Sequence, residues 1–172
     1  MRFIILIIIS SLCILEIKGD KASIVAKFSK SRVGCGYCHG ASGEVLTNSL
    51  LEQFHKNNPA KNNKNLLKKW LGKQVFDQGS FVYETFANVN IFLCHTADCT
   101  WKSTKISSKG SISNYPKDKV LILFKNNGAS MSIQGVYVGD RQYVYCKGPV
   151  YGVVKGTMPG PWTHWAIPKE LY

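Results

Sequence analysis

The chain of 172 residues has few arginines and few acidic residues. Only Arg2, Arg32 and Arg141 are arginine, and 10 Asp and Glu face 22 Lys and Arg, so the formal net charge is +12. This balance disfavours an acidic scavenger of small molecules and favours a polyanionic partner. Because lysine lacks the planar fork of a guanidinium, we expect any nucleic-acid contact to be blind to base sequence.

Long apolar runs are also scarce, since no stretch beyond the first segment approaches 18 apolar residues. The first segment places Arg2 before an apolar run from Phe3 to Leu15, which is typical of a signal peptide. A helix of that length spans only about 20 Å, too short for a hydrocarbon core of about 30 Å. We therefore expect residues 1–19 to be a signal peptide, with a cut near Ala22 as the alternative, and a secreted product without a stable membrane anchor.

The cysteines do not pair evenly once a signal peptide is removed. Loss of Cys13 leaves an odd number, in a compartment where thiols normally pair. We expect structural disulfides and one cysteine that is unpaired or used otherwise. Cys94 and Cys99 could close a small loop, and an N-terminal cysteine could bond to a late one, with the connectivity left open. The five cysteines concerned are Cys35, Cys38, Cys94, Cys99 and Cys146.

Hydrophobic patterning divides the chain into helices followed by strands. Residues 20–34 read as a flexible basic arm, and residues 35–172 as a single domain without internal repeats. Apolar residues at helical spacing predict a helix over 46–54 and a second from Leu66, reaching as far as Phe76. Short β-branched and aromatic runs predict strands at 81–86, 90–95, 120–125, 130–138, 142–146 and 150–155. The predicted class is α+β, with one or more N-terminal helices packed on an antiparallel sheet.

Two cysteines three residues apart and followed by histidine, Cys35, Cys38 and His39, form the most conspicuous local motif. This spacing attaches haem c, and Met158 could be the second axial ligand. A zinc site that adds Cys94, His95 and Cys99 is another interpretation. Disulfides are favoured over both in an oxidising compartment, so we expect neither cofactor nor metal.

The segments 135–146 and 151–157 carry a resemblance to a known family. A Gly-Val-Tyr run leads through a glycine turn to Asp-Arg at the start of a strand, and the next strand begins Gly-Val-Val. This pattern resembles the fungal guanyl-specific ribonucleases and implies a microbial ribonuclease-like fold. The resemblance matches the family's strand arginine to Arg141, but it places Leu121 and Gly156 where the general base and general acid should stand. Neither can move a proton, so the resemblance implies a protein without catalytic activity.

A secreted chain of this kind looks like the ribonuclease-like effectors associated with haustoria of powdery mildew fungi. The likeness implies a virulence protein that is a monomer and binds host RNA or host proteins, a plant immune receptor among them, with transfer into host cells left open. The expected RNA-binding residues are Arg141, Tyr143, Tyr145 and Lys147.

Two alternatives from other classes stay open. An active secreted ribonuclease or toxin would need a rearranged site, with Glu84 and His95 on paired strands near Arg141. A c-type cytochrome would use Cys35, Cys38 and His39.

Overall fold

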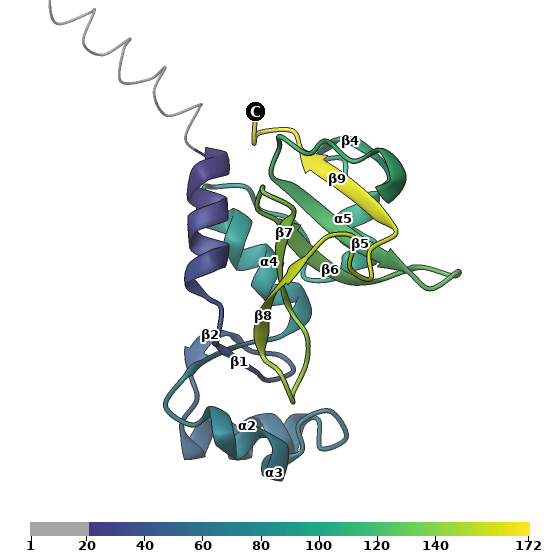
Figure 1. Cartoon of the computed structure of the whole chain (residues 1–172). Helices are drawn as coiled ribbons and strands as arrows, with labels where there is room; N and C mark the ends of the chain where they lie inside the picture. Colours follow the sequence, from purple (N-terminus) through teal and green to yellow (C-terminus); the bar gives the residue numbers. More distant parts are fainter. Residues whose placement is uncertain (1–20) are drawn as a thin grey trace, which may run out of the picture.

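The computed structural model describes residues 21–172, so the signal peptide expected at 1–19 lies outside the described residues. The chain folds into a six-stranded sheet and a three-stranded sheet, with helices packed around both (Figure 1). No helix between residues 21 and 172 is long and apolar enough to cross a membrane.

The first half of the chain builds the small sheet and most of the helices. After a helix over residues 21–31 come β1 (Gly36–Tyr37), β2 (Ser42–Val45), α2 (Asn48–Asn57), α3 (Lys64–Leu67), η1 (Lys68–Trp70) and β3 (Gln74–Phe76). Two further helices, α4 (Gln78–Ala87) and α5 (Ala97–Lys102), lead into the large sheet.

The second half is almost entirely strand. Its elements are β4 (Ile106–Ser111), η2 (Ile112–Asn114), β5 (Leu121–Asn126), β6 (Met131–Tyr137), β7 (Gln142–Cys146), β8 (Val153–Thr157) and β9 (His164–Pro168). The six strands are antiparallel neighbours in the order β4-β9-β5-β6-β7-β8. The sequence prediction for β7 matches the observed bounds, and those for β5 and β6 are close to them.

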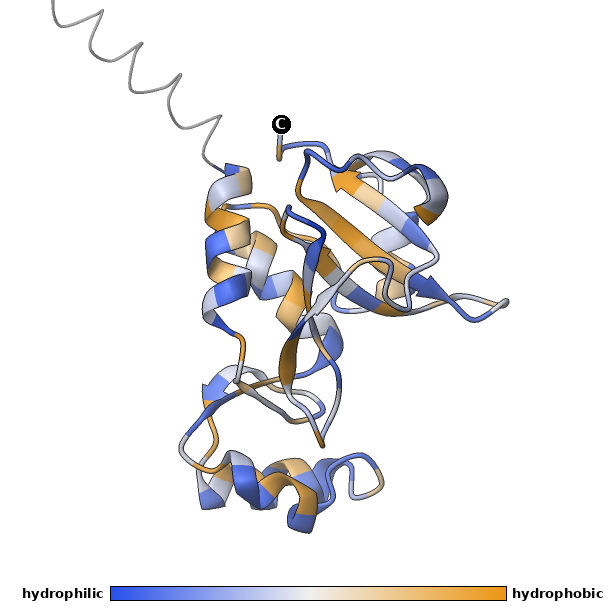
Figure 2. Ribbon diagram, in the orientation of Figure 1, coloured by the Kyte–Doolittle hydropathy of each residue, from blue (hydrophilic) through white to orange (hydrophobic). Residues whose placement is uncertain are grey.

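The large sheet is buried on both faces at its centre. All of 121–124 in β5 are fully buried, and β5 carries a long hydrophobic stretch (Figure 2). Because successive strand residues face opposite sides, Ile122 and Phe124 pack toward α4, whereas Leu121 and Leu123 pack toward Trp162 and other aromatic residues. The molecule therefore has a core on each side of one sheet.

Helix α4 lies where the sequence predicted a strand over 81–86, and that prediction is wrong. The run of β-branched and aromatic residues is helical because Asp77 caps it: the Asp77 carboxylate accepts the Ser80 N–H, and the Asp77 N–H is donated back to the Ser80 hydroxyl. Phe81, Val82 and Phe86 are buried against the sheet. Because so much of the α4 surface is buried, its sequence lacks the alternation of an apolar face and a polar face by which a surface helix is predicted.

The segment 20–34, expected as a flexible arm, is helical from residue 21 to residue 31. Val25 of this helix is fully buried in the same core as α4, with Ile24 packed beside it. The Ser29 hydroxyl donates to the Val25 carbonyl oxygen within the helix. Three apolar residues are too few to predict a helix from the sequence alone. In the folded protein, packing against the core stabilises the helix.

The small sheet holds α2 and α3 at one end of the molecule (Figure 1). The helix predicted over 46–54 is α2, and its cap is Thr47, whose hydroxyl accepts the Leu50 N–H at 3.2 Å. The second predicted helix is much shorter than expected. Its helical part ends with η1, and Phe76 is the last residue of β3. Parallel pairing of β1 with β3 adds a strand contact that no local pattern foretold.

The ribonuclease-like architecture predicted from the strand motifs is wrong. The sequence did not predict β4 or β9, which extend the large sheet beyond β5, and the predicted strand over 90–95 is irregular chain. Strand β4 is an edge strand without a fully buried residue, so it shows no alternation of apolar and polar positions.

Candidate functional site

A cavity of about 680 Å³ opens at the N-terminus of α4. Six segments that are far apart in the sequence form its walls. They are Tyr37 and His39, Ala60 and Lys61, the start of α4 at Asp77–Gly79, His95–Asp98 at the start of α5, Met131, Ser132 and Gln134 of β6, and the turn Lys147–Pro149. A cavity of this size, with polar groups on every wall, is the strongest candidate for a binding site in the described chain.

The start of α4 fixes the floor of the cavity. Both carboxylate oxygens of Asp77 are engaged, one by the Ser80 N–H at 2.7 Å and the other by the Gly40 N–H at 3.2 Å. Asp77 is therefore a structural cap rather than a free acid. Gln78, the first helical residue, is half-buried and lines the cavity. Helix N-termini carry partial positive charge, which favours ligand acceptor groups here.

Gly79 allows the loop that follows α4 to lie directly against the helix start. A β-carbon at this position would be 1.4 Å from the carbonyl oxygen of His95. No side chain fits there, so this wall of the cavity depends on glycine.

Gln134 enters the cavity wall from β6 and is 1% exposed. Its amide nitrogen donates to the Gly79 carbonyl oxygen at 3.3 Å, which fixes the orientation of the amide. Its Oε1 atom is buried, and no donor from residues 21–172 reaches it. A buried acceptor without a partner is unfavourable, so a ligand donor that reached Oε1 would stabilise Gln134.

The loop with His95 is closed by the disulfide between Cys94 and Cys99, one of the pairings that the sequence left open. All four residues within this loop line the cavity. The His95 ring stacks on Tyr83 with their centroids 3.9 Å apart, and the Thr100 hydroxyl donates to the Cys94 carbonyl oxygen at 3.0 Å. The disulfide and these contacts hold one wall of the cavity in place.

The opposite wall is held by a buried asparagine. The Asn62 carboxamide accepts the His39 N–H at 2.8 Å and donates to the His39 and Phe54 carbonyl oxygens. A third wall, the turn at Pro149, is fixed by Trp70, whose ring N–H donates to the Pro149 carbonyl oxygen at 2.9 Å. Sequence analysis missed Asn62, Gln78 and Gln134, because only the tertiary fold brings them together.

The remaining thiols lie outside the cavity lining. Cys35, Cys38 and Cys146 are free, and burial raises the pKa of each, that of Cys38 to about 12. At neutral pH these groups are thiols rather than nucleophilic thiolates. The cavity offers imidazoles from His39 and His95 and hydroxyls from Thr96 and Ser132, but none of the described cysteines.

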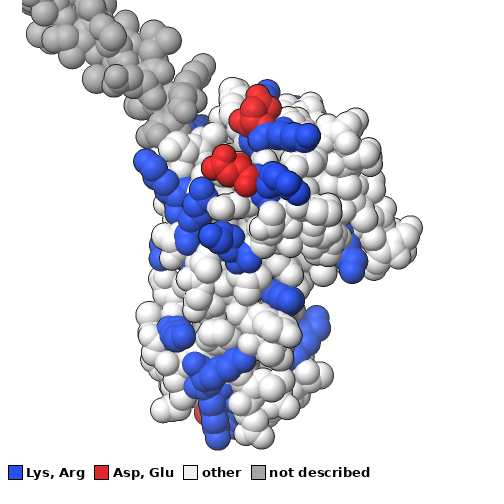
Figure 3. Space-filling model, viewed as in Figure 1, with Lys and Arg blue, Asp and Glu red and all other residues white. Residues whose placement is uncertain are grey.

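The charged residues around the cavity are of both signs. Lys61 and Lys147 lie on two walls, and Asp98, which pairs with Lys102 at 2.6 Å, lies on a third. That ion pair lowers the pKa of Asp98. Elsewhere lysine and arginine predominate, and they are spread from the N-terminal helix to α3 on the face seen in Figure 3.

The residues predicted for RNA binding do not form one surface. Tyr143 is buried against Trp162, with ring centroids 5.2 Å apart, and Tyr145 packs on the same indole. Lys147 lies at the α4 cavity, whereas Arg141 lies at a different hollow. Because Tyr143 is buried, its ring has no free face on which a base could stack, whereas Tyr145 is only half-buried.

The alternatives built on the other predicted residues also fail. Glu84 is on α4 and His95 in a loop, so they do not meet across paired strands. The bond between Cys94 and Cys99 removes both from a zinc site. Met158 packs in the aromatic core of the large sheet, whereas Cys38 packs beside α2, so a haem joining them has no place.

Comparison with known proteins identifies the fold. No family model matches the chain, and no curated protein matches it in sequence. Among solved structures it is similar to NlpC1 from Trichomonas vaginalis, with 18% identity, a TM-score of 0.56, and 87% of this chain and 44% of that chain covered. It is also similar to the NlpC/p60 domain of the peptidoglycan hydrolase SagA, with 12% identity, a TM-score of 0.57, and 85% and 97% covered. The described chain thus has the fold of an NlpC/P60 domain and spans less than half the length of the Trichomonas protein.

This finding corrects the identification made from sequence. The ribonuclease-like effector family is wrong, because the solved neighbours are NlpC/P60 domains. The partners expected from that family, host RNA, host proteins and a plant immune receptor, are wrong with it. The prediction that the chain is not an enzyme rested on Leu121 and Gly156 as lost catalytic positions. It is overturned as well, because one neighbour is named as a peptidoglycan hydrolase.

Proposed function

We propose that this protein is secreted and acts on bacterial cell wall, binding the short peptides of peptidoglycan in the cavity at the N-terminus of α4. The observation that carries the proposal is buried Gln134 in the wall of this cavity, whose Oε1 atom has no donor from residues 21–172, within an NlpC/P60 fold. A peptide supplies backbone N–H groups, which are the donors that Oε1 lacks.

The charges of the cavity support a peptide with free carboxylates. Lys61 and Lys147 attract carboxylates, whereas Asp98 is already paired with Lys102. Structures of RipA, a fold relative named for its interaction with resuscitation promoting factor, have been solved with changes at a cysteine, a glutamate and a histidine. Of these three residue types, the described cavity of this chain contains only histidine.

The direct test is calorimetric titration of the purified protein with soluble peptidoglycan fragments. One fragment carries the peptide, and its matched control is the same sugar unit without the peptide. The proposal predicts binding of the peptide-bearing fragment alone, and the masses of the recovered fragments show whether binding is accompanied by cleavage. Equal binding of both fragments, or binding of neither, would refute it.

Treatment with iodoacetamide separates this site from the thiols. Because none of the described cysteines lines the cavity, alkylation is expected to leave peptide binding unchanged. If binding is lost in parallel with alkylation while the protein stays folded, the peptide binds near a cysteine and not in this cavity.

A further inference from the structure

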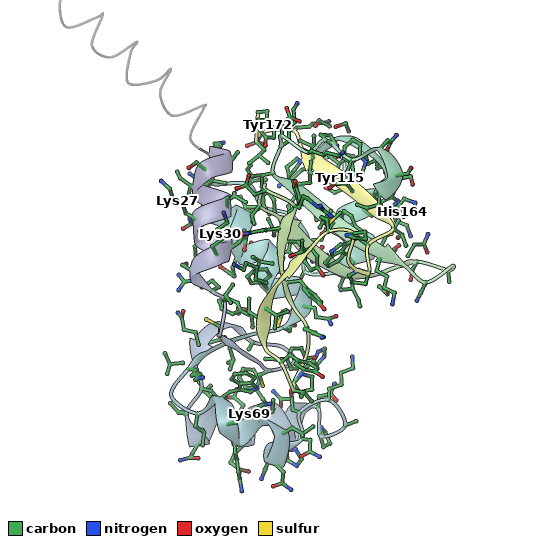
Figure 4. All side chains as sticks on the ribbon, viewed as in Figure 1. Lys27, Lys30, Lys69, Tyr115, His164 and Tyr172 are labelled. Carbon is green, nitrogen blue, oxygen red and sulfur yellow. A yellow bond between two sulfur atoms is a disulfide. The ribbon has the colours of Figure 1, made fainter. Side chains whose placement is uncertain are left out.

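A second hollow, of about 350 Å³, lies on the face of the large sheet opposite to α4. It is lined by Ser113, Tyr115, Lys117, Arg141, Met158 and Pro159. Met158 and Tyr137 belong to the core on the face of the large sheet that does not contact α4. The sheet therefore separates the two cavities. In Figure 4 Tyr115 lies at the large sheet, far from Lys69 beside α3.

Two cations line this hollow without an acidic partner. The only ion pairs formed by residues 21–172 are Lys64 with Glu52 and Lys102 with Asp98. Arg141 and Lys117 belong to neither pair. Asp118 and Asp140 are their neighbours in sequence, but neither lines the hollow.

A buried tyrosine holds both cationic residues in place. The Tyr137 hydroxyl donates to the Lys117 carbonyl oxygen at 3.0 Å and accepts the Arg141 N–H at 3.2 Å. Tyr137 itself is 1% exposed and fixed by Tyr115, with ring centroids 5.3 Å apart. The backbones of the two cations are thereby fixed relative to one another.

The Arg141 side chain is positioned as well. One guanidinium nitrogen donates to the Met158 carbonyl oxygen at 3.2 Å, and the Met158 N–H donates to the Arg141 carbonyl oxygen at 2.7 Å. A guanidinium has five N–H groups, so most of its donors remain available to a ligand. A fork whose orientation is already set loses little entropy when it binds a carboxylate or phosphate.

The turn that presents Arg141 is strained. Asp140 and Arg141 have φ of 50° and 60°, in the left-handed region that side-chain-bearing residues rarely adopt. Strain of this kind persists where the surrounding structure enforces it, and it is concentrated at ligand-binding sites. The Gln142 N–H closes the turn on the Gly139 carbonyl oxygen at 2.8 Å.

We propose that this hollow binds a small molecule with an anionic group, a carboxylate or a phosphate, attached to an apolar body. The anion is held by the Arg141 fork, with Lys117 adding a second positive charge. The apolar body packs on Met158, Pro159 and the Tyr115 ring, and the Ser113 hydroxyl offers one further polar contact. This site does not depend on the peptide site at α4.

The test is a titration followed by the NMR signal of the arginine Nε–H groups. The probes are acetate, benzoate and inorganic phosphate, which separate the carboxylate from the phosphate source and the small from the larger apolar body. Binding is expected to shift the Arg141 signal but not that of Arg32, and benzoate should bind more tightly than acetate. Absence of any shift with all three probes overturns the proposal.

The matched variants are Arg141→Asn and Lys125→Asn. Asparagine tolerates the left-handed conformation, so Arg141→Asn removes the guanidinium and keeps the turn. Lys125 is an exposed β5 lysine outside the hollow, and its replacement changes the net charge equally. We expect affinity for the tightest probe, followed by calorimetry, to fall about tenfold in Arg141→Asn and to stay unchanged in Lys125→Asn. Equal losses in both would mean only general attraction by a basic surface, which overturns the proposal, and thermal unfolding of each variant confirms that it is folded.

Discussion

The side-chain amide of Gln134 donates to the carbonyl oxygen of Gly79 at 3.3 Å, across a sequence separation of 55 residues. This contact joins β6 to the first turn of α4 at the floor of the cavity. It leaves the Gln134 carbonyl oxygen buried and without a donor from the described chain. The same contact is thus part of the fold and the reason for expecting a ligand.

Gly79 is expected to tolerate no side chain. In Gly79→Ala the new β-carbon would overlap the His95 carbonyl oxygen, so either the loop or the helix start must move. We expect a loss of about 3 kcal/mol or more in the free energy of unfolding, measured by urea denaturation. The control is Gly110→Ala, where the nearest atom is a Trp165 ring carbon at 3.2 Å and the loss should be much smaller. Equal losses would show that the approach of this loop to α4 is not as close as described.

The Cys94–Cys99 disulfide is expected to support ligand binding as well as stability. Replacing both residues by alanine opens the loop that carries His95, so affinity for a peptide fragment should fall while the large sheet stays folded. In the chain-entropy model a loop this short contributes about 2 kcal/mol of stability. Calorimetry and thermal unfolding check the two effects separately. Unchanged affinity in the double variant would show that this wall needs no covalent support.

Stability should decline at alkaline pH. Burial raises the pKa of Cys38 and of Tyr37 to about 12, above the values these groups have in the unfolded chain. The neutral forms therefore favour the folded state, and their contribution is complete below about pH 8 and is lost as the pH rises toward 12. Cys38→Ala is expected to flatten this decline, as measured by urea denaturation between pH 8 and 11. An unchanged slope would exclude the Cys38 thiol as a cause.

Tyr137→Phe tests the link between the two cations of the second hollow. The variant keeps the ring and loses the hydrogen bonds to Lys117 and Arg141, so we expect it to lose about 1 to 2 kcal/mol of stability. Affinity for benzoate should fall as well, because the two walls are no longer tied together. Tyr145→Phe is the control, since Tyr145 packs on Trp162 and does not line the hollow. Full benzoate affinity in Tyr137→Phe would show that the hydroxyl does not position the cations.

The sequence predicts strands best where local pattern and burial agree. Strand β7 alternates Tyr143, Val144 and Tyr145 between the two cores, and that alternation is legible in the sequence. Helix α4 was misread because its buried face is wide, although the Asp77 and Ser80 capping pair was a usable local signal. The edge strand β4 is polar on both faces, so nothing in its sequence distinguishes it from a loop.

The candidate site was beyond reach of the sequence for a different reason. Gln134 and Gly79 belong to no sequence motif, and they come together at the cavity only because β6 packs on α4. The conspicuous Cys35–His39 motif directed attention to metals and haem. In the structure Cys38 is a buried thiol 3.5 Å from the Asn62 carboxamide oxygen. Arg141 was predicted as an RNA-binding residue from a family to which the fold does not belong, and the structure places it at the second hollow.

The most direct test of the peptide-binding site is the affinity of Gln134→Leu for a peptidoglycan peptide fragment, measured by calorimetry beside the exposed control Gln53→Leu. Leucine keeps the size of the side chain but removes both the Oε1 acceptor and the Nε2 donor to Gly79, so thermal unfolding is measured beside the affinity. Affinity should fall about tenfold in the first variant and remain unchanged in the second. Gln78→Ala, at the half-buried start of α4, should also weaken binding if Gln134→Leu proves unstable. Wild-type affinity in both cavity variants would contradict the assignment of this cavity as the peptide site.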